Sequence, residues 1–289
     1  MTWLSIDTSS LFFRAFHALP PMTTRGGEPT SAIYGLSVLL LKLLREVRPS
    51  GIAFARDLPG GTFRHEAYAE YKAGRPAMPD LLRPQWRRLD QLIEAFGVPS
   101  HGVPGYEADD VLATLARVAP DHEDVLLVSG DRDLFQTVGP RVRVHFVGAR
   151  GKPPETLDET AVVARYGAPP ARLPLHFALT GEAADNLPGV PGVGAKTAGK
   201  LAAQFESGTA LFEGLEDVKP PALRAKLEPA REQVLRNESL ARLRTDLLLA
   251  TPLVLPFTGE ARAHVRAFFE ELEFKSLIPR LDALAASGA

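Results

Sequence analysis

The chain has 289 residues, of which 45% are hydrophobic and 24% charged, a balance typical of globular proteins that excludes a disordered chain. It contains no cysteine, so disulfide frameworks and thiolate zinc sites are excluded and a cytoplasmic setting is expected. The net charge of −2 argues against a polyanionic partner, although a whole-chain charge averages over local patches.

The longest apolar stretch, residues 33–44, is interrupted by polar residues and is shorter than the ~20 apolar residues that span a bilayer. The amino terminus, MTWLSIDTSS, lacks the basic and apolar regions of a secretory signal. The sequence therefore predicts neither a membrane span nor export.

The amino half alternates β-rich apolar runs with helical patterns. TWLSID ends at Asp7, SAIYGLSVLLLKLLREV has helical spacing and stops before Pro49, and GIAFARD predicts a second buried strand that ends at Asp57. A third strand, in DVLLVSGDRD, ends at Asp131 and Asp133. The alternation predicts parallel strands joined by helices, and functional groups gather beyond the carboxyl ends of such strands. We therefore expect these aspartates to share one crevice.

The segment FRHEAYAEYKAGRPAMPDLLRPQWRR is rich in basic and aromatic residues, and three prolines prevent it from forming one long helix. Residues 141–148, RVRVHFVG, alternate basic and apolar side chains, which predicts an edge strand. From about Leu173 the pattern changes to helices separated by glycine and proline, which predicts a second, helical subdomain.

The stretch PGYEADDVLATLA places Glu107, Asp109 and Asp110 directly before an apolar helical run. Carboxylates at close range raise each other's pKa, so the cluster is unfavourable unless solvent or a cation separates the charges. An acidic first helical turn that favours the helix dipole is the alternative. Because three strands also end in aspartate, we favour a cation site.

The predicted metal ligands are all acidic, with no histidine or cysteine in their motifs. Hard oxygen ligands select Mg²⁺, or Mn²⁺ as a substitute, over zinc. Two such ions can activate water and stabilise the leaving oxygen of a phosphodiester. The predicted ligands are Asp7, Asp57, Glu107, Asp109, Asp110, Asp131, Asp133, Glu182 and Asp185.

The segment NLPGVPGVGAKTAGKLAAQF predicts a glycine hairpin followed by a helix. The free amides around Gly192 and Gly194, at a helix amino terminus, suit a phosphate, and K⁺ at the hairpin is a further candidate. Lys196 and Lys200, four residues apart, would present two positive charges to the same nucleic-acid backbone. A glycine turn that only packs two helices is the alternative. GVGAKT departs from the P-loop pattern and no strand precedes it, so ATP hydrolysis is disfavoured.

Taken in order, these segments resemble the 5′ nuclease family, which comprises the 5′-3′ exonuclease domain of bacterial DNA polymerase I, stand-alone exonucleases and flap endonucleases. The resemblance covers nearly the whole chain. It is carried by SIDTSSLFFRAFHAL, FRHEAYAEYKAGRPAMP, PGYEADDVLATLA, LLVSGDRDLFQTV and LTGEAADNLPGVPGVGAKTAGKL.

The resemblance implies an α/β fold: a parallel-sheet, PIN-like nuclease core over residues 1–172, with a helical arch at about 62–90. A helical DNA-binding subdomain would follow over 173–289, with a helix-hairpin-helix type (H3TH) motif at about 173–206. The implied activity is structure-specific 5′-3′ exonuclease or flap endonuclease cleavage of DNA by two metal ions, in replication and repair. The implied partners are DNA with a 5′ flap, a nick or a 5′ end, and a DNA polymerase, and a monomer is expected.

The resemblance also assigns roles outside the acidic cluster. Lys72 and Arg75 of YKAGR would engage the scissile phosphate and the 5′ strand, and Tyr71 would offer a stacking surface. Arg14 and Arg64 match family arginines near the same DNA path.

Two motifs depart from the family pattern. Glu182 of LTGEAADN stands where the family has a metal-site aspartate, and FARD replaces the usual FD, which makes the register of Phe54 and Asp57 uncertain. A non-catalytic scaffold that binds branched DNA is therefore an alternative function, and an RNA-directed nuclease is another. Whether the chain is a stand-alone enzyme or an excised polymerase domain stays open.

Overall fold

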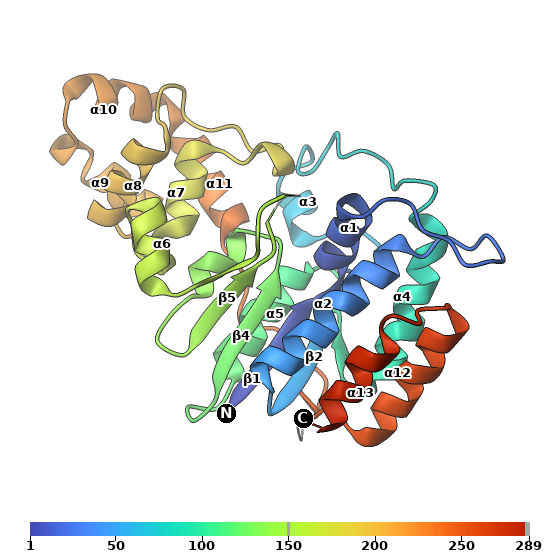
Figure 1. Ribbon diagram of the computed structural model, residues 1–289. Helices are drawn as coiled ribbons and strands as arrows, with labels where there is room; N and C mark the ends of the chain where they lie inside the picture. The colour runs from blue at the N-terminus through green and yellow to red at the C-terminus, as the bar shows by residue number, and fades with distance from the viewer. Residues whose placement is uncertain (149–150, 287–289) are drawn as a thin grey trace.

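The computed structural model describes residues 1–148 and 151–286, and a six-stranded sheet forms its centre (Figure 1). The strand order is β3-β2-β1-β4-β5-β6, and every pair is parallel except the antiparallel pair of β5 and β6. This mostly parallel sheet confirms the predicted α/β fold class. The strands are β1 (Thr2–Asp7), β2 (Gly51–Ala55), β3 (Ser100–His101), β4 (Asp124–Ser129), β5 (Val142–Phe146) and β6 (Glu155–Leu157).

The central strands bury apolar side chains on both faces, which explains their continuous hydrophobic runs. In β1, Leu4 and Ile6 point into one core cluster, whereas Trp3 points into the other. The first cluster is covered by α1 (Thr8–Ala18), α2 (Ser31–Val47), α4 (Arg83–Phe96), α12 (Gly259–Glu271) and α13 (Ile278–Ala286). The second is covered mainly by α5 (Ala108–Val118), the 3-10 helix η1 (Asp133–Thr137) and α6 (Glu159–Tyr166).

A separate apolar cluster organises the helices that follow the sheet. Figure 1 shows this helical unit beside the sheet, on the side away from α12 and α13. Its α-helices are α7 (Leu173–Thr180), α8 (Ala195–Gln204), α9 (Gly208–Glu213), α10 (Pro221–Leu227) and α11 (Arg231–Ala241). Short 3-10 helices join or precede them: η2 (Pro170–Arg172), η3 (Ala183–Asp185), η4 (Leu215–Asp217) and η5 (Glu228–Ala230).

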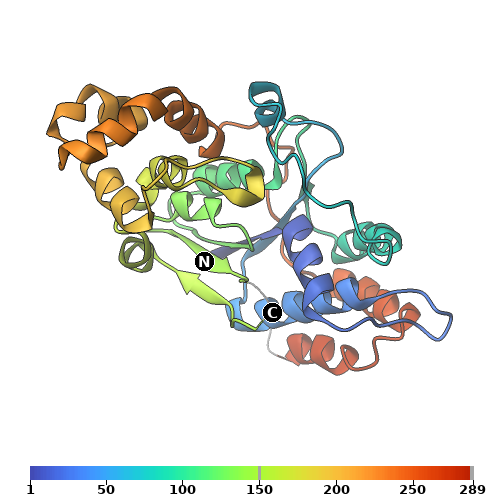
Figure 2. The ribbon, with the colours of Figure 1, turned by 90° about the horizontal axis from the view of Figure 1, so that it is seen from above.

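The last two helices return to the α/β core. Phe269 of α12 and Leu281 of α13 belong to the same cluster as the sheet residues Leu4 and Ile52. Figure 2 shows α12 and α13 beside α4 and α2, away from the helical unit. The sequence had grouped this segment with the helical subdomain, because its amphipathic helices gave no sign of which surface they cover. The division near residue 173 otherwise stays a prediction.

Two further expectations change in detail. The strand predicted within residues 141–148 is β5, but it is not an edge strand, because β6 pairs with its outer side. The segment predicted as a helical arch contains α3 (Phe63–Ala67) and the start of α4, with turns and non-helical chain over residues 68–82 (Figure 1). Over the described parts of the chain, no helix is long and apolar enough to cross a membrane.

Candidate active site

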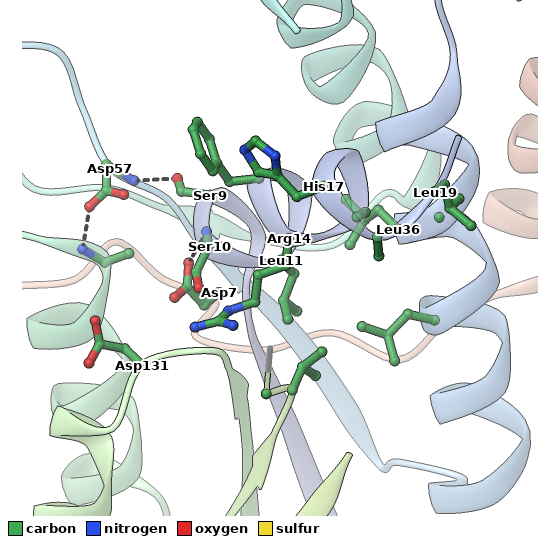
Figure 3. A pocket seen from close by; sticks show the side chains of 18 of the residues that line it. Asp7, Ser9, Ser10, Leu11, Arg14, His17, Leu19, Leu36, Asp57 and Asp131 are labelled. Atoms are coloured by element: carbon green, nitrogen blue, oxygen red, sulfur yellow. Dashed lines mark hydrogen bonds between the residues drawn. The ribbon is translucent and has the colours of Figure 1, made fainter. Parts of the chain in front are cut away.

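A cavity of about 1110 Å³ opens beyond the carboxyl ends of β1, β2 and β4. Asp7, Asp57 and Asp131, which follow these three strands, all line it. In Figure 3 the three aspartates lie at one end of the cavity, and Leu19 and Leu36 lie at the other. Asp7, Asp57 and Asp131 thus share one crevice, as we expected from the sheet topology, whereas Asp133 does not line it.

Short hydrogen bonds hold Asp7 and Asp57 in this crevice. Asp7 caps α1, because its Oδ1 accepts a hydrogen bond from Ser10 N at 2.9 Å, while its Oδ2 accepts one from Ser129 Oγ at 2.7 Å. Asp57 Oδ1 accepts from the backbone N–H of Ala108 at 2.9 Å, at the start of α5. The FARD sequence therefore still delivers its aspartate to the cavity.

The buried acids repel one another. Burial raises the pKa of Asp7 to about 7, with a further contribution from Asp57. Burial likewise raises the pKa of Asp109, where Asp131 adds most among the neighbouring charges, and that of Asp133, again with Asp131 as the main charged neighbour. These aspartates therefore interact unfavourably with one another as well as with their partly buried surroundings.

Asp110 differs from its neighbours because its oxygens are occupied. It is 0% exposed and accepts two hydrogen bonds from Arg64, at 2.7 and 2.8 Å. It also accepts from the backbone N–H groups of Glu107 and Arg244, at 3.1 and 2.9 Å. A direct metal contact does not fit this geometry, so Asp110 is placed to support the start of α5 instead.

Arg64 and Tyr71 are buried, which corrects their predicted roles. Arg64 is 2% exposed and pairs with Asp110, so it cannot reach DNA in this structure. Tyr71 is 3% exposed and its hydroxyl donates to Asp185 at 3.0 Å and to Glu107 at 3.2 Å, so it offers no open stacking surface. The sequence could not predict this, because a charged or aromatic residue in a polar segment is usually exposed.

Lys72 and Arg75 line the cavity through ion pairs with its acids. Lys72 Nζ lies 2.6 Å from Glu107 Oε1, and one Arg75 guanidinium nitrogen lies 2.8 Å from Asp185 Oδ1. Burial alone would lower the pKa of Lys72, but Glu107 and Asp185 raise it above its ordinary value. Lys72 and Arg75 therefore place two basic side chains at the border of the cavity.

The second group of acids lies beside the first. Asp133 donates its backbone N–H to Asp131 Oδ1 at 2.9 Å. Glu182 does not line the cavity, because its carboxylate pairs with Arg132 at 3.0 Å. Arg132 was not identified from the sequence. Its position within GDRD, between two predicted metal ligands, is the sequence signal that could have indicated a role at this site. The longer Glu182 side chain is thus paired with Arg132, and its predicted role as a metal ligand stays a prediction.

Arg14 lines the cavity from α1. Its guanidinium donates to the backbone carbonyl of Gly130, and this close approach leaves no room for a Cβ at that position. Burial lowers the pKa of Arg14, while Asp131 and Asp7 act in the opposite direction. Arg14 therefore lies beside the acids of the cavity, and its predicted contact with DNA stays a prediction.

Within the described residues, no three acidic or histidine side chains already stand at metal-binding spacing. Two observations nevertheless fit divalent ions. Asp109 Oδ1 is buried without a hydrogen-bond partner, and burial together with neighbouring carboxylates raises the pKa values of Asp7, Asp109 and Asp133. An all-oxygen donor set suits Mg²⁺ or Mn²⁺.

The predicted glycine hairpin is present in the helical unit. Gly192 has φ of +78°, a left-handed conformation that favours glycine, and Gly194 precedes the first residue of α8. Lys196 and Lys200 of α8 are exposed. Sequence reasoning missed Lys226 of α10, whose Nζ would lie 2.5 Å from a Cβ placed on Gly192. No sequence signal links these two positions, which lie on different elements.

The strand order, the acidic side chains beyond the carboxyl ends of the sheet and the basic glycine hairpin are together the features that the motifs predict for a 5′ nuclease. The chain belongs to the 5′-3′ exonuclease family. The N-terminal resolvase-like domain of that family matches residues 2–167, and its C-terminal SAM fold matches residues 168–257. The resemblance drawn from the motifs is thereby confirmed, as is the class of enzyme it implies.

The curated relatives include DNA polymerase I of Mycobacterium tuberculosis (strain ATCC 25618 / H37Rv), which is 41% identical over an alignment of 295 positions that covers 99% of this chain and 32% of the relative. The thermostable DNA polymerase I of Thermus thermophilus is 40% identical and is covered to 33%, against 98% of this chain. The chain thus spans about a third of the length of these relatives.

Solved structures share the fold at low sequence identity. A structure of T5 5′-exonuclease with bound divalent metal ions (zinc) has a TM-score of 0.67 and 19% identity, covering 94% of this chain and 98% of that one. The catalytic core of Rad2 in complex with DNA substrate has a TM-score of 0.59 and 17% identity, covering 98% and 92%. At such identities the likeness supports the fold, and it confirms the fold class predicted from the sequence.

Proposed function

We propose that this chain hydrolyses phosphodiester bonds of DNA near 5′ ends and 5′ flaps, as a structure-specific 5′-3′ exonuclease and flap endonuclease. The observation that carries the proposal is the meeting of Asp7, Asp57, Asp109 and Asp131 in one cavity, bordered by Lys72. Family membership and the DNA-bound structures that share the fold support the substrate class.

The proposed cofactor is a pair of Mg²⁺ ions, replaceable by Mn²⁺. One group of metal ligands would line the cavity: Asp7, Asp57, Glu107, Asp109 and Asp131. Two further ligands, Asp133 and Asp185, would lie beside this group. When bound, two divalent ions activate a water molecule and stabilise the leaving oxygen. Asp110, with its oxygens held by Arg64, would keep the start of α5 in place.

Lys72 and Arg75 would bind the phosphate that enters the cavity. In the DNA-free protein their charges are satisfied by Glu107 and Asp185, so an incoming phosphate competes for the same cations. The two positive charges would then orient the phosphodiester and stabilise its developing negative charge. These contacts would go to the phosphate backbone of the DNA and not to its bases, which suits cleavage that largely ignores the base sequence.

The helical unit would bind the duplex part of the substrate. The amides around Gly192 and Gly194 and the exposed Lys196 and Lys200 offer positive charge to a phosphate backbone. A K⁺ ion at the hairpin is a further part of the proposal. Lys226, which reaches Gly192 from α10, would add one more cation.

The proposed setting is the bacterial cytoplasm, where a monomer would act in replication and repair with a DNA polymerase. The polymerase relationship rests on the curated relatives, of which this chain matches about a third. Processing of primers and of 5′ flaps at nicks would follow from the proposed substrate class.

The direct test incubates the purified protein with a labelled 5′-flap duplex in Mg²⁺ and in EDTA. We expect cleavage only with Mg²⁺, and loss of cleavage in Asp131→Ala with the fold retained by circular dichroism. Asp121→Ala is the matched control, because Asp121 is fully exposed and pairs only with Arg141 among the described residues. Binding of the flap without cleavage would favour the scaffold function, and preference for RNA in a competition assay would favour the RNA-directed nuclease.

A second test separates phosphate orientation from metal binding. In Lys72→Ala we expect a single-turnover rate at least ten-fold lower, with Mn²⁺ binding retained, because Lys72 acts on the phosphate. Lys42→Ala, an exposed lysine of α2, is the control. An unchanged single-turnover rate in Lys72→Ala would remove Lys72 from the chemistry.

A further inference from the structure

The end of α11 and the chain that follows it, residues 240–244, are held by side chains of three elements. Arg64 Nε, in α3, donates to the carbonyl of Leu240 at 2.8 Å. Asp110 Oδ1, in α5, accepts from the N–H of Arg244 at 2.9 Å. The third side chain is Gln136 of η1, the 3-10 helix that begins at the proposed ligand Asp133.

Gln136 uses its whole amide on backbone groups. Its Nε2 donates to the carbonyl of Asp133 at 2.9 Å and to the carbonyl of Ala241 at 2.9 Å. Its Oε1 accepts from the N–H of Leu243 at 3.0 Å. One side chain therefore ties the residue that carries a proposed ligand to the end of α11, more than a hundred positions away in the sequence.

The other part of α11 is tied to the loop before the glycine hairpin. Asn237, which is 0% exposed, donates its Nδ2 to the carbonyl of Pro188 at 2.8 Å, and Gln233 Nε2 donates to the same carbonyl at 2.8 Å. Helix α11 (Arg231–Ala241) spans the residues between these two sets of contacts. Hydrogen bonds and one helix thus connect the hairpin loop to Asp133 without a break.

We propose that Gln136 is a positioning residue of the nuclease: it fixes Asp133 relative to the end of α11, and so sets the spacing between the acidic cluster and the DNA-binding helical unit. This inference rests on the proposed function. Gln136 does not line the cavity, so it would act through Asp133 and not on the substrate. Outer hydrogen-bond partners of metal ligands commonly change metal affinity or activity by ~10-fold or more.

The test substitutes Gln136→Met, which keeps the length of the side chain and removes all three hydrogen bonds. We expect about ten-fold weaker Mn²⁺ binding to the DNA-free protein, measured by electron paramagnetic resonance. We also expect a lower kcat on a 5′-flap duplex, with KM changed by less than about two-fold, because the hairpin surface is untouched. Gln91→Met, at an exposed glutamine of α4 that contacts Arg88, is the matched control and should leave both quantities unchanged.

A purely structural role would lower the Tm of Gln136→Met but leave Mn²⁺ affinity and kcat unchanged well below that temperature, and this result would overturn the inference. If Gln136→Met does not fold, Gln136→Glu serves instead, because it can still accept from Leu243 N–H but cannot donate to Asp133. Wild-type Mn²⁺ affinity in a folded Gln136→Glu would equally overturn the inference. Failure of the wild-type protein to bind Mn²⁺ or to cleave would instead refute the proposed function.

Discussion

Asp7 should make the metal-free protein less stable as the pH rises. Asp7 is 2% exposed, and its pKa is raised to about 7 in the folded state, mainly by burial and then by Asp57. In the unfolded chain the same carboxyl titrates near 3.8. Between these values the folded protein holds a proton that the unfolded chain has lost, so the free energy of unfolding falls with increasing pH.

The size of the effect follows from the two pKa values. A shift of this order corresponds to about 4 kcal/mol in full, at roughly 1.4 kcal/mol per pKa unit. By pH 5 the carboxyl of the unfolded chain is already largely ionised. The free energy of unfolding should therefore fall by about 2 to 3 kcal/mol between pH 5 and pH 8. Replacement of Asp7 by Asn removes the titration but keeps an oxygen that can accept from Ser10.

The assay is urea unfolding in EDTA at both pH values, for wild type and for Asp7→Asn. The wild type should lose about 2 to 3 kcal/mol more than Asp7→Asn on going from pH 5 to pH 8. Added Mn²⁺ should restore most of this loss at pH 8, because the ion binds the ionised carboxyl. Equal pH dependence in the two proteins would refute the reasoning that burial and Asp57 perturb Asp7.

Three further substitutions test other parts of the structure. Arg64→Met should lower the free energy of unfolding by about 3 to 5 kcal/mol, because it leaves the carboxylate of Asp110 buried and unpaired. A loss below about 1 kcal/mol in urea unfolding would contradict the claim that Arg64 and Asp110 form a buried ion pair. Lys226→Gln should weaken duplex binding and reduce the slope of log K against log salt by about 1, while Lys42→Gln should not; equal slopes in a fluorescence anisotropy titration would place Lys226 outside the DNA surface. Gly192→Ala should destabilise the protein by about 1 to 2 kcal/mol, because φ is positive there and the new Cβ would meet Lys226, and an unchanged urea midpoint would argue against this strain.

The sequence predicted the sheet and its acidic edge because both depend on local patterns. An apolar strand that ends in aspartate specifies where the side chain lies once the strands are parallel, and Asp7, Asp57 and Asp131 accordingly reach one cavity. The helix α2 also begins and ends where its spacing and Pro49 indicate. These features need no knowledge of distant partners.

Other parts of the site depend on contacts between residues far apart in the sequence. The burial of Arg64 follows from its pairing with Asp110 and with the end of α11, which no local pattern reveals. Pairing of Arg132 with Glu182, and the reach of Lys226 to the hairpin, are likewise set by tertiary packing. Composition identified these residues as charged, but the fold decides which charges are paired with other side chains and which remain exposed.

The most direct test of the proposed metal centre is anomalous diffraction from crystals of the protein soaked in Mn²⁺. We expect two peaks within the cavity, bounded by Asp7, Asp109 and Asp131, and their disappearance in Asp131→Ala or a marked fall in their height. Peaks found only outside the cavity, or none from a crystal that diffracts well, would contradict the claim that these carboxylates collect paired divalent ions.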